Sequence, residues 1–172
     1  MRLMITWPRR ALPTAVCLLA LTGCTVPVAG VTGVTVSARG EPLGVLLVCH
    51  DRIDTAVLHP DDPAERDTED AGEPEWTDSW TAEEPVTAYT TWPLTAPAGG
   101  GGLTRDAAPH ALEPDRLYRV YGTTRDNSWS TDAHSFTLAD LKRLRPDQVA
   151  YTDGDEVRTT TLTDFRTRAC EN

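Results

Sequence analysis

The sequence predicts a mainly β domain, a small β-sandwich with one or two short helices near its C-terminus. Short stretches that alternate apolar and polar residues recur along the chain, and Gly, Pro and Asp separate them. Two of the three cysteines that follow the N-terminal leader, Cys49 and Cys170, lie far apart, where a disulfide would close one domain. About 149 of the 172 residues follow the leader, which suits a single domain.

The first three predicted strands form a meander. Residues 31–38 alternate apolar and small polar side chains, as a half-buried strand does. Residues 44–49 are continuously apolar and rich in branched side chains, which favours a central strand. Residues 53–58 follow after a tight turn and complete the meander.

The middle of the chain changes character. Residues 61–84 hold 11 acidic residues and one arginine, which predicts a long solvated loop. Residues 86–92 return to alternation and predict a strand, whereas the Pro-Ala-Gly-rich segment 97–102 predicts an irregular connection. Residues 117–123 predict another strand, with Tyr118 and Val120 on one face.

The C-terminal third mixes helices and strands. Thr137 and Asp140 are placed to cap a short helix that Pro146 ends. Residues 149–151 and 157–161 flank Asp153-Gly154, which predicts a hairpin. Thr163 is expected to cap a last helix over residues 164–169.

The immunoglobulin pattern of two strand cysteines around a core tryptophan is not met. No tryptophan follows Cys49 closely, and Cys170 lies at the end of the chain. The strand topology is therefore left open, although the number of short strands still predicts a sandwich of immunoglobulin-like or fibronectin-like architecture.

Residues 1–23 have the parts of an export signal. Arg2, Arg9 and Arg10 make a basic start, and an 11-residue apolar stretch over 11–21 follows it. That stretch is shorter than the roughly 20 residues that span a bilayer. Arg9-Arg10 leaves general secretion and twin-arginine export both open.

Leu21-Thr22-Gly23-Cys24 resembles the lipobox of bacterial lipoproteins. The resemblance implies that residues 1–23 are removed and that Cys24 becomes the acylated N-terminus on the outer face of the cytoplasmic membrane. Residues 24–30 then form a short tether, and 31–172 form the domain. The chain has 15 arginines and one lysine, and with the lipobox this composition is similar to small surface lipoproteins of actinobacteria.

The charge of the domain excludes some partners. Three of the 16 basic residues and none of the 26 acidic ones lie in the signal, so the remaining chain is strongly acidic. Nucleic acids and anionic membrane surfaces both require clustered Lys and Arg. The lipid anchor would hold the protein at the membrane without a basic patch.

Loss of Cys17 with the signal and acylation of Cys24 leave Cys49 and Cys170. An even pair outside the cytoplasm predicts a disulfide, and closing a loop of about 120 residues stabilises a domain by up to roughly 5 kcal/mol. A catalytic thiol or a metal pair is the alternative. Cys49 and His50 are adjacent in a strand, so their side chains point to opposite faces and would not form a dyad.

Polar side chains that could carry chemistry cluster in one segment, namely Ser128, Ser130, Asp132, His134 and Ser135. No Gly-x-Ser-x-Gly motif accompanies them, so a polar loop is the preferred interpretation and a hydrolase built around His134 is an alternative. The four histidines lack metal-ligand spacing, and the acidic segment lacks the pattern of a calcium loop. We therefore expect neither a metal nor a cofactor.

Tryptophans in polar surroundings provide the other candidate site. They could stack on sugar rings or fill a partner's pocket, but the preferred interpretation is that they cover the core, because large aromatic side chains are usually highly buried. The leading hypothesis is a non-enzymatic lipoprotein that acts by binding or protein interaction, with another envelope protein or wall glycan as the partner. A carbohydrate-binding module for wall glycan is its rival. The tentative contact surface is Trp76, Trp80, Trp129, Asp61, Asp62 and Glu65.

Overall fold

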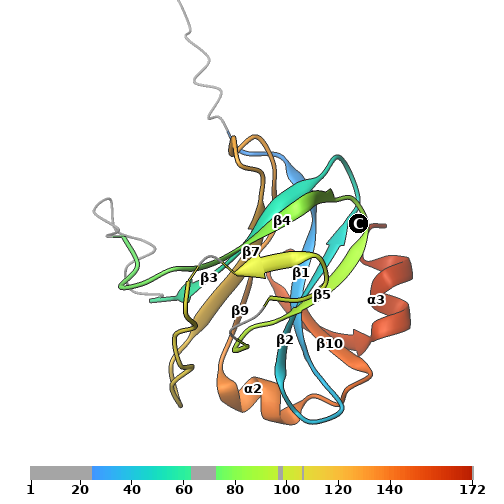
Figure 1. Ribbon diagram of the computed structural model, residues 1–172. Helices are drawn as coiled ribbons and strands as arrows, with labels where there is room; N and C mark the ends of the chain where they lie inside the picture. Colours follow the sequence, from blue (N-terminus) through green and yellow to red (C-terminus); the bar gives the residue numbers. More distant parts are fainter. Residues whose placement is uncertain (1–24, 63–72, 97–98, 106, 172) are drawn as a thin grey trace, which may run out of the picture.

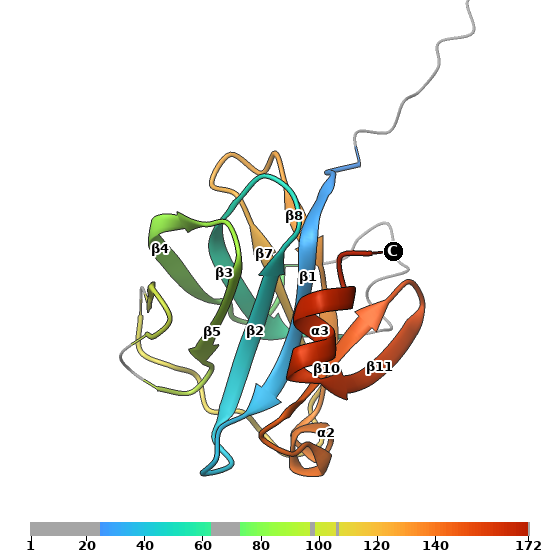
Figure 2. The same ribbon diagram turned by 90° about the vertical axis from the view of Figure 1, so that its right-hand side faces the viewer.

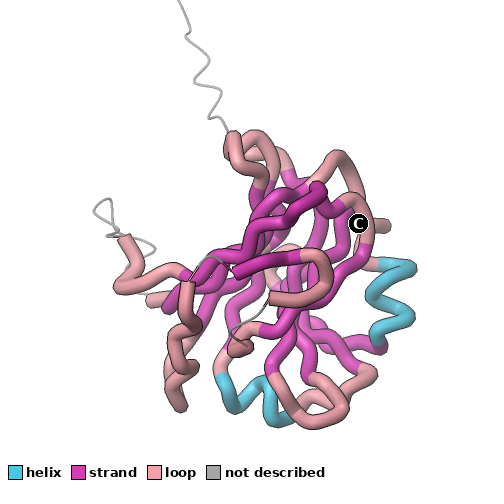
Figure 3. Tube along the Cα trace, viewed as in Figure 1, coloured by secondary structure: helices cyan, strands magenta, loops and turns pink. Residues whose placement is uncertain are grey.

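The computed structural model describes residues 25–62, 73–96, 99–105 and 107–171. In this part of the chain, eleven strands and two short helices form one β-rich domain (Figures 1 and 3). The predicted fold class, mainly β with short helices in the C-terminal third, is confirmed. The predicted signal, the lipobox-like motif with Cys24, and Glu65 lie outside the described residues.

The strands are β1 (Val28–Val36), β2 (Pro42–Val48), β3 (Ile53–Pro60), β4 (Asp78–Val86), β5 (Tyr89–Pro93), β6 (Leu103–Arg105), β7 (Tyr118–Thr123), β8 (Ser130–Asp132), β9 (His134–Phe136), β10 (Gln148–Asp153) and β11 (Glu156–Thr161). The helices are α2 (Leu138–Arg143) and α3 (Leu162–Arg168).

All strands belong to one sheet that nearly closes into a barrel. One layer runs β5–β2–β1–β10–β11, and the other runs from β9 through β7, β3 and β4 to β6. Strand β8 joins them, because it pairs in parallel with β1 and in antiparallel with β7. The edge of β1 opposite β2 is therefore shared, with β8 near its start and β10 near its end.

The core lies between the two layers. Its largest fully buried side chains include Trp80, Trp92, Tyr118, Phe136 and Leu46, which come from strands of both layers. A second apolar cluster lies on the outer face of β1, β2 and β10 and is covered by α3 (Figure 2).

The disulfide Cys49–Cys170 is present, with a Cα–Cα distance of 5.5 Å, and it links the end of β2 to the segment after α3. Inside the second cluster, Tyr151 and Phe165 meet edge to face at 5.1 Å. The chain terminus is thus held to the sheet by a covalent bond and by aromatic packing.

Local signals placed two elements correctly. Thr137 caps α2 and forms the predicted capping box with Asp140. Strands β10 and β11 form the predicted hairpin, but its turn is Gly154–Asp155, one residue later than the predicted Asp153-Gly154, and Gly154 has φ +60°. The cap of α3 is Thr161 and not Thr163, so this helix begins two residues earlier than predicted.

The predicted tether is too long. Strand β1 begins at Val28, so residues 28–30 belong to the sheet. Gly30 pairs with Val48, and a Cβ atom at Gly30 would collide with the backbone of Leu47. A glycine is therefore needed at this position, because the two strands approach each other closely.

The predicted solvated loop over residues 61–84 is wrong in its last part. Residues 78–84 belong to β4, in which Asp78, Trp80 and Ala82 face inward and the acidic pair Glu83–Glu84 stays exposed. The acidic composition of the whole segment concealed this short alternating pattern. Strands β8 and β9 likewise occupy the segment predicted as a polar loop.

No described helix has the length and apolar character that crossing a bilayer requires.

Candidate functional site

The predicted contact surface is not assembled as one surface. Trp80 is fully buried in the core and cannot contact a partner, which corrects its assignment. Trp76 is half-buried, and its ring stacks on His110 with centroids 4.4 Å apart. Trp129 is half-buried and packs against the core, while Asp61 is buried and Asp62 exposed.

The predicted cluster of serines, Asp132 and His134 does not form a triad. His134 is buried and its Nδ1 lies 3.1 Å from Thr152 Oγ1, whereas the Ser135 hydroxyl donates to Asp61 at 2.6 Å. Burial lowers the pKa of His134 to about 4, so its ring is neutral at physiological pH. Ser128 is exposed and bonds to Asp126 in its own turn.

A groove lies beneath the β10–β11 hairpin. Two adjoining cavities of about 500 and 410 Å³ share Ser135 and Val157 in their walls. The first extends past Leu144 and Ala150 at the α2 end, and the second ends at Gly154 in the hairpin turn. We call these two cavities together the hairpin groove.

Charged groups of both signs line the hairpin groove. Arg119, Asp132 and Asp155 lie in the wall of the cavity near the hairpin turn. Desolvation, together with the carboxylate of Asp153, raises the pKa of Asp132. Opposite charges on one cavity wall suit a polar partner that carries complementary groups.

The rim of the hairpin groove is a free strand edge. In the described part of the chain, β11 pairs with β10 alone and forms the end of the sheet (Figure 2). Five of its six residues are exposed, and Val157 keeps 67% of its surface accessible. Val157 and Thr159 also line the hairpin groove, so edge and groove form one site.

The hairpin register tells which backbone groups face outward. A two-residue turn is closed by the hydrogen-bonded pair Asp153–Glu156, and such pairs alternate along an antiparallel ladder. Arg158 and Thr160 therefore face β10 with their N–H and C=O groups. Val157 and Thr159 turn theirs away from it. This pattern is the template for adding another strand.

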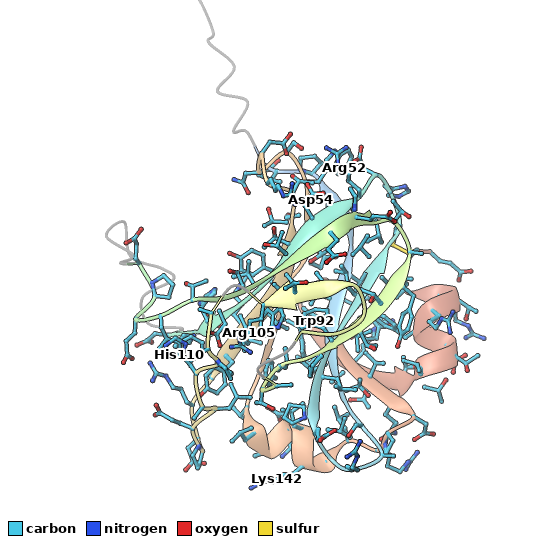
Figure 4. All side chains as sticks on the ribbon, viewed as in Figure 1. Arg52, Asp54, Trp92, Arg105, His110 and Lys142 are labelled. Carbon is cyan, nitrogen blue, oxygen red and sulfur yellow. A yellow bond between two sulfur atoms is a disulfide. The ribbon has the colours of Figure 1, made fainter. Side chains whose placement is uncertain are left out.

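The opposite end of the sheet is covered by polar contacts. Arg105 of β6 pairs with the buried carboxylate of Asp78, and its Nη1 donates to Leu94 O at 3.0 Å, which bridges toward β5. His110 donates from Nδ1 to the other Asp78 oxygen at 2.8 Å. Figure 4 places Arg105 between Trp92 and His110.

No group of three or more His, Cys, Asp or Glu side chains that could hold a metal occurs among the residues that the structure describes. Comparison with protein families, with curated protein sequences and with solved structures finds nothing that matches this chain.

The sequence did not single out the hairpin groove, because candidate residues were ranked by chemical type. A strand was predicted over residues 157–161, but no local feature indicates that it ends the sheet. Arg119 in the hairpin groove was also missed. Its strand was predicted with Tyr118 and Val120 on one face, which already placed Arg119 on the other face.

Proposed function

We propose that this chain is an extracytoplasmic lipoprotein whose domain binds an extended segment of a partner protein, which adds to the sheet as a strand beside β11. The observation that carries the proposal is the free edge of β11 above the hairpin groove. Main-chain hydrogen bonds would supply much of the affinity, and the groove would select side chains.

The lipobox at Cys24 supports the membrane address. Three residues separate Cys24 from β1, and they span at most roughly 11 Å. An anchored domain would therefore stand close to the membrane. Strand β10 runs antiparallel to β1, so the hairpin turn lies at the same end as the start of β1 and the free edge faces sideways.

Other roles for the candidate residues receive less support. The ring face of Trp76 that turns to His110 is covered, and Trp80 is buried, which leaves little for stacking on a sugar. His134 is hydrogen-bonded to Thr152 and Ser135 to Asp61, so the two side chains do not form a nucleophile–base pair. A strand edge needs neither an open aromatic face nor a nucleophile.

Site-specific crosslinking on intact cells tests the proposal. A photoreactive residue at Val157 should capture one dominant protein, whereas the same residue at exposed Thr104, in β6 at the other end of the sheet, should not. Thr159→Pro removes an outward N–H and should abolish capture by Val157, while Thr159→Val keeps that N–H and should retain it.

Equal capture from positions 157 and 104, or capture that survives Thr159→Pro in a protein with unchanged melting temperature, would refute strand addition. Recovery of wall glycan independent of Thr159→Pro would instead favour the carbohydrate-binding alternative. Labelling with radioactive palmitate that persists in Cys24→Ser would refute the anchor.

A further inference from the structure

We infer that the partner segment presents a single carboxylate to Arg119 inside the hairpin groove. This inference rests on the proposed function, since it names the chemistry of the segment that β11 would receive.

Arg119 is directed into the groove by strand alternation. Its neighbours Tyr118 and Val120 are fully buried in the core, so Arg119 points to the outer face of β7. In the strand register, Arg119 lies opposite Ser135 of β9 and His59 of β3, and its side chain is half-buried. It lines the same cavity as Val157 at the rim.

The other arginines around the groove have partners within the protein. Arg143 pairs with Asp140, Arg145 with Asp147, and Arg158 with Asp153. In the described ranges, by contrast, the guanidinium of Arg119 has neither a hydrogen bond nor an ion pair. Guanidinium matches a carboxylate in geometry and charge better than it matches any neutral group.

The geometry of strand addition brings such a carboxylate within reach. A strand added to β11 would lie about 4.8 Å from it, with alternate side chains directed to the groove face. Val157 and Thr159 mark that face. A groove-facing acidic side chain, or the C-terminal carboxylate of the segment, would enter the cavity that Arg119 lines.

The remaining charges limit the partner to one carboxylate. Asp132 and Asp155 line the same cavity as Arg119. A second carboxylate there would meet like charge without a free cation. Residues that flank the carboxylate in the partner should therefore be neutral or basic.

Synthetic peptides test this specificity on the folded, signal-free domain. The host is an acetylated, amidated peptide of about eight alternating Thr and Val residues, a typical strand length. A single Glu replaces Thr at each position in turn, with Gln at the same position as the matched control. A further peptide without Glu carries a free C-terminal carboxylate, which separates the two possible sources.

At one position, we expect fluorescence polarisation to show that the Glu peptide binds about tenfold more tightly than the Gln peptide. Arg119→Gln should remove that difference, and Arg119→Lys should restore it only in part, because a lysine cannot make a bidentate contact. Preference for the free-acid peptide over every Glu peptide would identify the chain terminus as the source.

The failures are distinguishable. Glu and Gln peptides that bind the wild-type domain equally, yet lose binding in Thr159→Pro, would overturn the role of Arg119 and leave strand addition standing. A Glu preference that survives Arg119→Gln would also overturn it. Absence of binding by every peptide would count against strand addition, and the inference would fall with it.

Discussion

Strands β6 and β11 lie at the two ends of the sheet. The edge of β6 is covered by side-chain contacts, whereas the edge of β11 is exposed. Beside β6, Arg105 donates to Leu94 O at 3.0 Å, and Thr90 Oγ1 donates to Gly101 O at 2.7 Å, so side chains bridge the gap to β5. Strand β11 has β10 as its one strand partner in the described part of the chain. An edge can be covered even where strand pairing does not close the barrel.

Covering the β6 edge has energetic consequences. Arg105 and Asp78 are both buried, and their pair is favourable only while both partners are present. Within the described residues, Trp80 Nε1, Trp92 Nε1 and Arg105 Nε are buried without a hydrogen-bond partner. Strand β11 is mostly exposed, and it has neither the proline nor the lysine that protects many edge strands against the addition of another strand.

The largest expected effect is at the covered edge. Asp78→Ala should lower the free energy of unfolding by about 3–5 kcal/mol, because it leaves the buried Arg105 without a counter-charge and frees His110. Urea denaturation measures this loss. Glu83→Ala, at an exposed position of the same strand, is the control and should change stability by less than about 0.5 kcal/mol. Equal midpoints for the two variants would contradict the comparison.

The stability of the side of the domain that carries β11 depends on the Cys49–Cys170 disulfide. Replacing Cys49 and Cys170 by serine should cost about 2–5 kcal/mol, since the disulfide holds the segment after α3 against the sheet. A reductant should lower the urea midpoint of the wild-type domain and leave that of the double variant unchanged. A wild-type midpoint insensitive to complete reduction would show that α3 packing alone suffices.

Stability should fall in mild acid because of His134 beneath the hairpin. Its pKa is lowered to about 4 by burial, below the ordinary value of 6.5, so the unfolded chain binds the proton more readily. Stability is therefore full above pH 6.5 and declines as the pH falls toward 4, by about 2 kcal/mol between pH 7 and pH 5. Urea denaturation of His134→Gln over this range should show a smaller slope. An unchanged slope would assign the acid sensitivity to other groups.

The smallest effect on stability is expected at the free edge. Val157→Lys should change the free energy of unfolding by less than about 0.5 kcal/mol, because this side chain is 67% exposed. The same variant should weaken partner capture, since lysine at an edge discourages strand addition. Thermal unfolding measures the first effect. Cell-surface crosslinking from a photoreactive residue at exposed Glu156, in place of position 157, measures the second. A loss of more than about 1 kcal/mol would mean that Val157 packs as a core residue does.

Elements with strong local signals were predicted well. The hairpin over β10 and β11 follows from Asp153-Gly154 between alternating segments, and α2 follows from the Thr137–Asp140 capping box. Strand β4 was missed, because its pattern is short and the acidic residues around it dominate the composition. Trp80 was included in the tentative contact surface, but its strand carries it into the core, which agrees with the preferred interpretation that the tryptophans cover the core.

By itself, the sequence determined that this is a mainly β domain with a terminal disulfide, a capped helix and a late hairpin, because turns, caps and alternation act over a few residues. It also carries the lipobox-like motif on which the proposed address rests. Tertiary structure decided which strand ends the sheet, that Arg119 lines the hairpin groove, and that Asp78 and Arg105 meet in the core. These features depend on pairings between distant segments, and no local pattern encodes the register that brings such segments together.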